Sequence, residues 1–198
     1  MRYLWITTVF MALFTPSSGN AAEASPQAKV TVVVTNGTAN GTAVEGDEVK
    51  LLLYKGQEQI DSLSAKVGQD GKGVFENVPA GQSMAAVARA KHQNMAFNSQ
   101  PVLLGSASGE ASASVQVFDV SADTSKLSVG THHIIVAARS TSLEFKEFMQ
   151  LRNPSDMAIT GSQRDDQNRP IVIAIRLPKG FRDLSTSSYL EQEALVVT

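Results

Sequence analysis

The residues best suited to chemistry are three histidines, His92, His132 and His133, in a chain of 198 residues that contains no cysteine. Successive side chains of a β-strand point to opposite faces, so the adjacent His132 and His133 cannot bind one metal ion from a regular strand. Only a β-bulge would bring both rings to one side. A copper or zinc ion would need further ligands, and the chain offers these helpers: His92, Glu147, Asp119 and Asp123. We predict that no metal and no cofactor is bound, with His132, His133 and Glu147 as the metal candidates.

An enzyme would need a recognisable set of reactive groups, and the sequence shows none. Without cysteine there is no thiol nucleophile, no thiolate metal site and no disulfide. The segment Gly105–Gly109 carries two serines but lacks the G-x-S-x-G pattern of a nucleophile elbow, and phosphate loops, dinucleotide fingerprints and H-E-x-x-H are absent too. We therefore predict no catalytic residues and a protein that is not an enzyme.

Glu147 breaks an otherwise regular pattern. From Leu143 to Leu151 every second residue is apolar, but Glu147 falls in the apolar phase and Phe148 in the polar one. Either a β-bulge near Lys146 resets the register, or the Glu147 carboxylate points into the core and must be paired. The partners available for a buried Glu147 would be Arg139, Arg152, Arg176 or a histidine. We favour the bulge, or a position at the end of a sheet.

Few aromatic residues are placed to form a binding surface. Sugar-binding modules usually display coplanar aromatic rings, and the only tryptophan, Trp5, lies near the N-terminus. Phe148, Phe181 and Tyr189 fall outside the expected core phases, so they predict an exposed patch that suits a protein interface. Together with Leu195 they are our interface candidates. We expect a protein partner from the cell envelope or self-association, with a sugar as the alternative.

The segment Ser187–Val197 combines β-forming and apolar residues, and we expect it to form a strand. Its edge could pair with a second copy or with a partner protein, or it could close its own sheet. Glu191 and Glu193 could instead act as gatekeepers against aggregation.

The first 24 residues are typical of an export signal. Arg2 precedes an apolar run from Tyr3 to Phe14, which is too short to span a bilayer, and small residues follow. Ala22-Glu23-Ala24 fits the A-x-A rule, so we predict cleavage after Ala24 and a periplasmic or secreted protein. An uncleaved membrane anchor or a buried helix is the alternative. The absence of cysteine favours a bacterial source.

The composition excludes one class of partner. The formal net charge is −2 and the isoelectric point is about 5.9, with Lys and Arg spread along the chain. A nucleic-acid-binding protein would usually carry a basic face, so we predict no nucleic-acid partner.

After the signal, the hydrophobic period is two and turn residues recur every 8 to 15 positions, which predicts an all-β fold of antiparallel sandwiches. The expected strands are Val30–Thr35, Asp47–Tyr54, Gln59–Ala65, Gly73–Glu76, Ser83–His92, Asn98–Leu104, Val115–Val120, Thr131–Arg139, Leu143–Arg152, Pro170–Leu177 and Ser187–Val197. Residues 105–112 are small and resemble a linker. We therefore predict a signal peptide over 1–24, one sandwich over 26–104, the linker 105–112 and a second sandwich over 113–198.

Part of the first half resembles a known family. Val30–Thr35, the strand ending at Tyr54 and the segment Gly68–Gly81 (GQDGKGVFENVPAG) are similar to the carboxypeptidase regulatory-like and transthyretin-like β-sandwich modules, over about residues 29–104. Gln69 stands where those modules more often have threonine. The resemblance implies a non-catalytic module that binds or stabilises, and it brings no catalytic residues. The second half, with its histidine-bearing strand and an E-x-x-x-L-x-N-P segment, resembles an uncharacterised β-domain that follows such modules in exported bacterial proteins.

These observations favour a non-catalytic accessory, scaffold or protein-interaction protein of the bacterial envelope. The alternative is a periplasmic module that binds a metal ion or a carbohydrate.

Overall fold

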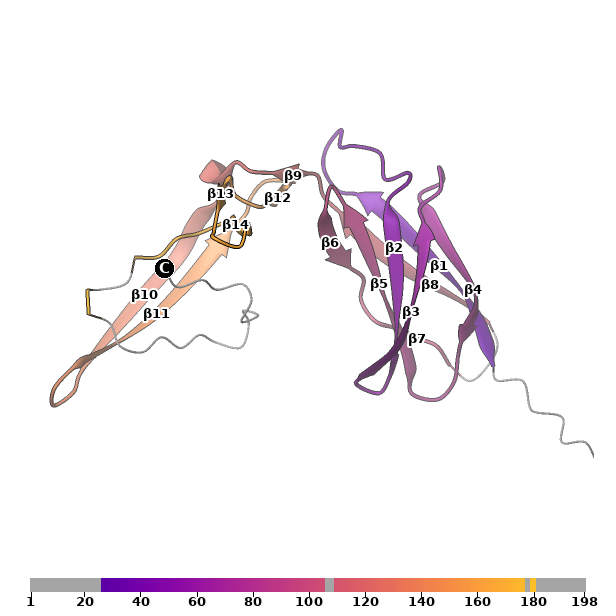
Figure 1. Cartoon of the computed structure of the whole chain (residues 1–198), viewed down its shortest axis with the longest axis horizontal. Coiled ribbons are helices and arrows are strands. Elements are labelled where there is room, and N and C mark those ends of the chain that lie inside the picture. The colour runs from indigo at the N-terminus through magenta and orange to yellow at the C-terminus, as the bar shows by residue number, and fades with distance from the viewer. Residues whose placement is uncertain (1–25, 106–108, 177–178, 181–198) are drawn as a thin grey trace, which may run out of the picture.

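The structure is a computed structural model, and it describes residues 26–105, 109–176 and 179–180. Within these ranges the chain is all-β, with no α-helix and a single 3-10 turn, so the predicted fold class is confirmed. No helix in the described ranges is long and apolar enough to cross a membrane. Figure 1 shows a β-sandwich and a second, more open part that meet at β9 and β12.

The first sheet of the sandwich has the order β4-β1-β8. It contains β1 (Gln27–Asn36), β4 (Lys72–Pro79) and β8 (Glu110–Val117). β4 is antiparallel to β1, but β8 runs parallel to it, with Lys29 opposite Glu110 and Asn36 opposite Val117. The sheet is therefore mixed, whereas we predicted antiparallel pairing throughout.

The second sheet has the order β3-β2-β5-β6, with β7 also paired to β5. The strands are β2 (Glu48–Lys55), β3 (Glu58–Lys66), β5 (Met84–His92), β6 (Met95–Asn98) and β7 (Val102–Leu103). All of these pairs are antiparallel. β5 lies at the centre of this sheet and ends at His92, the first residue of the site described below.

The core lies between the two sheets and follows from the alternation in sequence. Val30, Val32 and Val34 of β1 are buried while the residues between them are partly exposed, as expected when one sheet face packs on a core. Leu51 and Leu53 of β2 are fully buried opposite them. Within the described ranges, every buried hydrophobic side chain lies between Ala28 and Val117, so this core belongs to the sandwich.

The structure corrects the predicted domain boundary. Residues 110–112 of the predicted linker and the first residues of the predicted second domain form β8, which pairs with β1 along its whole length. Ala113, Val115 and Val117 point into the sandwich core and are buried. The first domain thus extends to Val117, because its first sheet needs this strand as well.

The second part consists of two-stranded pairs in the described ranges. Its elements are β9 (Val120–Ser121), the 3-10 turn Thr124–Lys126, β10 (Ser128–Ala138), β11 (Leu143–Arg152), β12 (Ala158–Ile159), β13 (Gln163–Arg164) and β14 (Pro170–Ile171). β10 and β11 form a long antiparallel hairpin, β12 pairs parallel to β9, and β13 pairs with β14. The strand predicted over Pro170–Leu177 is confined to Pro170–Ile171 among the residues described.

Several predictions fall on residues outside the described ranges. These are the signal peptide over 1–24, the strand Ser187–Val197 with Glu191 and Glu193, and the interface candidates Phe181, Tyr189 and Leu195.

Candidate functional site

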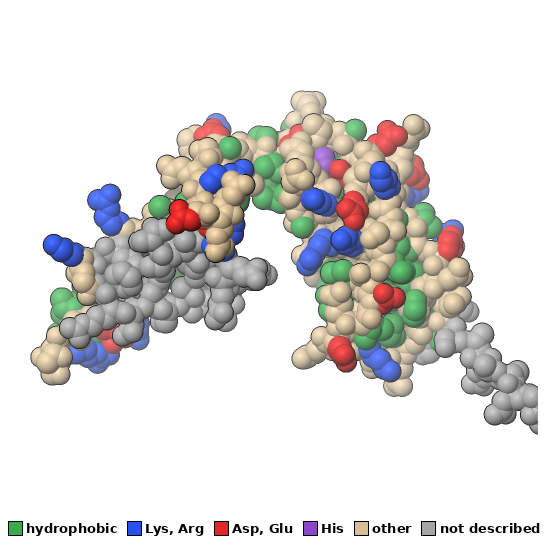
Figure 2. Space-filling model, in the orientation of Figure 1, with side chains coloured by type: hydrophobic (Ala, Val, Ile, Leu, Met, Phe, Trp, Pro, Cys, Tyr) green, Lys and Arg blue, Asp and Glu red, His purple; other side chains and the backbone are tan. Residues whose placement is uncertain are grey.

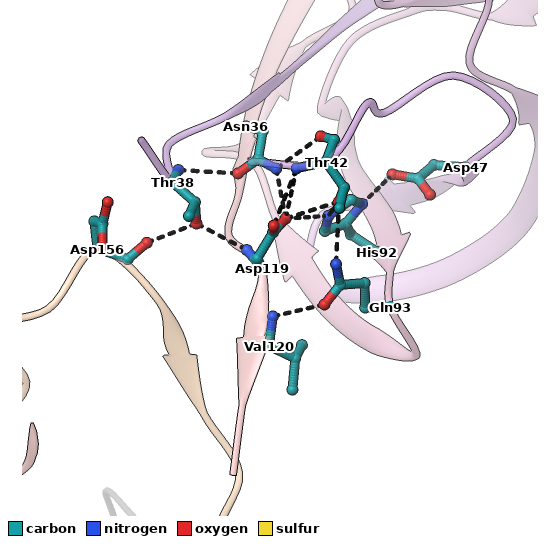
Figure 3. A network of polar contacts seen from close by, with 9 residues as sticks. All are labelled: Asn36, Thr38, Thr42, Asp47, His92, Gln93, Asp119, Val120 and Asp156. Atoms are coloured by element: carbon teal, nitrogen blue, oxygen red, sulfur yellow. Dashed lines mark hydrogen bonds and ion pairs between the residues drawn. The ribbon is translucent and has the colours of Figure 1, made fainter. Parts of the chain in front are cut away.

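A group of hydrogen-bonded polar side chains lies where the sandwich joins the second part (Figure 3). We call it the junction network. Its members are Asn36, Thr38, Thr42, Asp47, His92, Gln93, Asp119 and Asp156. They come from the end of β1, the β1–β2 loop, the end of β5 and the segments that follow β8 and β11. The network therefore joins segments that are far apart in the sequence.

His92 reaches the network because of the alternation of β5. Every second residue of this strand from Met84 points into the core, and His92 is the last in that phase. The two residues that follow, Gln93 and Asn94, have φ values of 47° and 68°, as in the two-residue turns that close tight hairpins. This turn places the Gln93 side chain so that its amide nitrogen donates to Thr42 Oγ1 at 3.0 Å and its amide oxygen accepts from the Val120 amide at 2.8 Å.

The His92 ring lies between two carboxylates. Its Nδ1 is 2.6 Å from Asp47 Oδ2, and its Nε2 is 2.9 Å from Asp119 Oδ1. The residue is only 2% exposed. With an acceptor at each ring nitrogen, the ring can donate two hydrogen bonds only when it is protonated on both sides.

Asp119 receives donors from three directions. Asn36 Nδ2 donates to its Oδ1 at 2.7 Å and Thr42 Oγ1 donates to the same oxygen at 2.8 Å, while the Thr42 amide donates to Oδ2 at 3.0 Å. His92 adds the fourth donor. Among the described residues, no buried side-chain nitrogen or oxygen lacks a partner, so the network is fully satisfied.

These contacts shift the pKa values of both groups. Burial disfavours the charged imidazolium, but the hydrogen bonds that the ring donates to Asp119 and Asp47 outweigh this effect, so the pKa of His92 lies above its ordinary range. The hydrogen bond from His92 holds the pKa of Asp119 far below its ordinary range against the opposing effect of burial, with Asn36 and Thr42 adding to the shift. Both shifts favour the charged pair, an imidazolium held between carboxylates.

The geometry includes a threonine, a histidine and an aspartate in contact, but it is not arranged for nucleophilic catalysis. Thr42 Oγ1 lies 3.0 Å from His92 Nε2, the position in which a base would accept its proton. Asp119 Oδ1 also lies within hydrogen-bond distance of His92 Nε2. While the ring carries both protons it cannot act as a general base, and the Thr42 hydroxyl then donates to Asp119.

The network also connects the sandwich to the second part. Thr38 Oγ1 donates to the Asp156 carbonyl at 2.6 Å, and the Ala39 amide donates to Asp156 Oδ2 at 2.8 Å. The Asp119 amide donates to Thr38 Oγ1 at 2.9 Å, and its carbonyl accepts from the Ala158 amide at 2.9 Å. Asp119 therefore takes part in both the sandwich and the β9–β12 pair.

We expect the protein to be most stable at a pH between the two titrations. The stabilisation from Asp119 is present above its unfolded pKa of about 3.9 and is lost as the pH falls toward its lower folded value. The stabilisation from His92 is complete below about pH 6.5 and is lost as the pH rises through its higher folded value. The free energy of unfolding, measured in urea from about pH 3 to about pH 9, should therefore fall on both the acidic and the alkaline side of its maximum. In His92→Gln the fall on the alkaline side should vanish, and a wild-type profile that is flat on that side would contradict the assignment.

The structure places the predicted metal candidates on the β10–β11 hairpin. His132 Nε2 lies 3.1 Å from Glu147 Oε2, and both side chains are about two-fifths exposed. His133 lies on the opposite face of β10, beside Phe148, as the alternation requires. His92 and Asp119 do come together, but as an ion pair, and Asp123 instead accepts from the Ser125 amide at the 3-10 turn. No group of three or more possible metal ligands occurs in the described ranges.

The predicted bulge at Lys146–Glu147 is wrong. Both residues pair in regular register, with Ile135 opposite Lys146 and Ile134 opposite Glu147, and the irregularity lies instead between Val129 and Thr131. Glu147 is neither buried nor at the end of the pair, because its carboxylate is solvated beside His132. A histidine is among the partners expected for a buried Glu147, but the observed pair of Glu147 and His132 lies at an exposed site.

The hairpin exposes large apolar side chains on both faces. Eight of them are between 45% and 63% exposed, and we call these residues the hairpin surface: Val129, Ile134, Ile135, Val136, Leu143, Phe145, Phe148 and Leu151. Phe148, an interface candidate from the sequence, is 61% exposed. By contrast, on the face that Figure 2 draws, charged groups of both signs are scattered over the sandwich.

The two pairs of rings in contact among the described residues form no flat platform for a sugar. Phe97 and Phe118 meet at an interplanar angle of 57°, and His133 and Phe148 meet at 62°. Stacking on a sugar face would instead need coplanar exposed rings. The described residues therefore add no support for the carbohydrate alternative.

Sequence reasoning found part of the junction network and missed the rest. His92 and Asp119 were recognised as possible ligands, but Asp47, Asn36 and Thr42 were not linked to them. Residues 36–38 and 40–42 both have the sequence Asn-Gly-Thr, and Asn36, Thr38 and Thr42 of these segments make hydrogen bonds of the network.

Comparisons with known proteins add little on function. The chain matches no family model and no curated protein. Among solved structures it is similar to a DUF3823 family protein from Parabacteroides merdae, with 16% identity over 64% of this chain and 59% of that one, and a TM-score of 0.32. It is also similar to a "putative carbohydrate binding protein" from Bacteroides uniformis, with 12% identity over 65% of this chain and 54% of that one, and a TM-score of 0.29.

The chain thus spans less than two thirds of the length of either neighbour. Likeness at this level does not extend to activity, ligand or partner, and the resemblance to carboxypeptidase regulatory-like modules stays a prediction.

Proposed function

We propose that this protein is a non-catalytic accessory of the bacterial envelope that binds a protein partner through the hairpin surface. The observation that carries the proposal is the exposure of eight large apolar side chains on two adjacent strands. Single exposed apolar residues are ordinary, but a cluster of this kind is typical of a surface that another protein covers. Phe145 and Phe148 are its aromatic members, one on each face of β11, and each is the best anchor for a contact on its own face.

We propose a non-catalytic protein because of the contacts in the junction network. Its one buried histidine is held by carboxylates at both nitrogens, so it supports no reactive group. The sandwich would then serve as the rigid body that carries the hairpin. Export to the periplasm or exterior rests on the pattern of residues 1–24 alone.

The partner is expected to be a protein with an apolar β-surface. Lys146 and Glu144 form an ion pair beside the apolar residues, and such polar groups would form the rim of the contact. A second copy of the chain, and cover of this surface by residues 181–198, are the other outcomes that the experiment below must separate.

Phe145→Ser and Phe148→Ser should each weaken partner binding by about 2 kcal/mol, or roughly 30-fold in Kd, since exposed aromatic anchors dominate such contacts. Their effect on the free energy of unfolding should stay within about 0.5 kcal/mol, because both side chains are exposed. The measurement is capture from the envelope fraction, followed by titration of the captured protein. Leu103→Ser is the matched control, since Leu103 is 79% exposed but lies on the sandwich.

Three results would contradict the proposal. Equal capture by wild type and both phenylalanine variants would show that the hairpin surface is not the contact. A concentration-dependent dimer in wild type that is lost in the variants would assign the surface to self-association. A clear loss of stability in both variants would show that the surface is covered within the chain.

A further inference from the structure

We propose that His92 and Asp119 form a pH-responsive latch: when His92 loses its proton, Asp119 loses two of its four donors and the second part moves more freely relative to the sandwich. The proposal is independent of the hairpin surface as a binding site. It rests on the geometry of the junction network, in which one carboxylate joins a titratable ring to the segment that connects the two parts.

Asp119 contacts both the sandwich and the second part, so a change at His92 can affect both. Its side chain is held by Asn36, Thr42 and His92 of the sandwich. Its carbonyl accepts from the Ala158 amide, and the next residue, Val120, begins β9, the strand that pairs with β12. Loss of the side-chain contacts would therefore loosen the point at which the chain enters the second part, where the bonds of Thr38, Ala39 and Gln93 remain.

The Thr42 hydroxyl provides the means of release. A neutral His92 can keep only one N–H, and the shorter contact, 2.6 Å to Asp47, favours Nδ1. Nε2 then becomes an acceptor, and Thr42 Oγ1 lies 3.0 Å from it. If the hydroxyl turns to Nε2, Asp119 loses the ring and the hydroxyl together and keeps only Asn36 and the Thr42 amide as donors.

Among the described residues, Asp47 and Asp119 are the charged groups that pair with the His92 ring. The elements that meet at His92 are the β1–β2 loop, β5 and the segment after β8, and their charged groups in contact with the ring are Asp47 and Asp119. Glu45, Glu48 and Lys91 lie on the same elements but are exposed. The raised pKa of His92 and the lowered pKa of Asp119 agree with a charged pair in the closed latch.

The latch can be tested on the full chain because it contains no cysteine. Ser62→Cys on β3 and Ser140→Cys in the turn between β10 and β11 give two exposed sites for a pair of fluorescent labels. The distance distribution between the labels is measured by single-molecule energy transfer from about pH 5 to about pH 9. The ring titration of His92 is followed by NMR with His132→Gln and His133→Gln, which leave it as the one histidine.

We expect the distance distribution to broaden as the pH rises, with a midpoint that coincides with the His92 titration. Far-UV circular dichroism should stay constant over the same range, since the sandwich remains folded. In His92→Gln the distribution should not change with pH. In Thr42→Val the broadening should be smaller, because Nε2 then lacks the hydroxyl that competes for it.

A distribution that stays constant while His92 titrates would overturn the latch. So would a loss of circular dichroism at the same midpoint, which would show global unfolding instead of a local release. If His92→Gln fails to fold, Thr42→Val still tests the proposed release. A distance distribution that broadens in this variant as much as in the wild type would refute the role of the hydroxyl.

Discussion

Replacing His92 with alanine is expected to lower the free energy of unfolding by about 3 to 5 kcal/mol, the usual cost of removing one partner from a buried ion pair. The ring is buried and contacts Asp47 and Asp119. Without it, two carboxylates face each other with no cation between them, and Asp119 keeps only Asn36 and Thr42 as donors. Urea unfolding near pH 6, where the wild-type ring is charged, would measure the loss.

His132→Ala is the matched control for this experiment. His132 also pairs with a carboxylate, Glu147, but on the exposed hairpin, where such pairs contribute less than about 1 kcal/mol. The two variants remove the same side chain from a buried and a solvated ion pair. Equal, small losses in both would show that the junction network adds little to stability.

The sequence predicts best those strands whose two faces differ. In β1 the valines at positions 30, 32 and 34 alternate with less buried residues, and the expected strand lies within the observed one. β5 follows the same rule. In both strands a period of two reflects the pleat of a strand with one face packed on the core. The hairpin strands β10 and β11 are also predicted, although neither of their faces is buried.

The sequence predicts a linker over the first residues of β8 because most of them are small. Ala111 and Ala113 are in phase with Val115 and Val117, so the strand does alternate, but its first half offers little apolar area. Its partner, β1, lies about 80 residues earlier and runs parallel to it. No local pattern in the sequence indicates a parallel neighbour at this distance. The pairing of β8 with β1 is seen only in the folded sandwich.

The junction network was beyond prediction for a related reason. Its hydrogen bonds join Asn36 and Thr42 to Asp119, and His92 to Asp47, across 45 to 83 residues of sequence. Each residue alone fits a turn or a strand end. Their meeting depends on the order of strands in two sheets, which the hydrophobic pattern does not contain.

This corrected boundary leads to the prediction with the largest effect. Val115 and Val117 are fully buried, and burying a valine side chain contributes about 1.5 to 3 kcal/mol, so the two together account for roughly 3 to 6 kcal/mol. A small domain is stable by only about 5 to 15 kcal/mol in total. Removing β8 also unpairs one edge of β1 and takes Asp119 away from His92.

A fragment of residues 26–104, the domain as first predicted, should therefore fail to fold, whereas a fragment of residues 26–122 should unfold cooperatively in urea. The longer fragment keeps β8 and Asp119, and it lacks the hairpin and the Asp156 contacts. Circular dichroism and amide dispersion in NMR spectra would compare the two. A cooperatively folded 26–104 fragment would show that β8 is an accessory to the sandwich and that the boundary near residue 104 is the correct one.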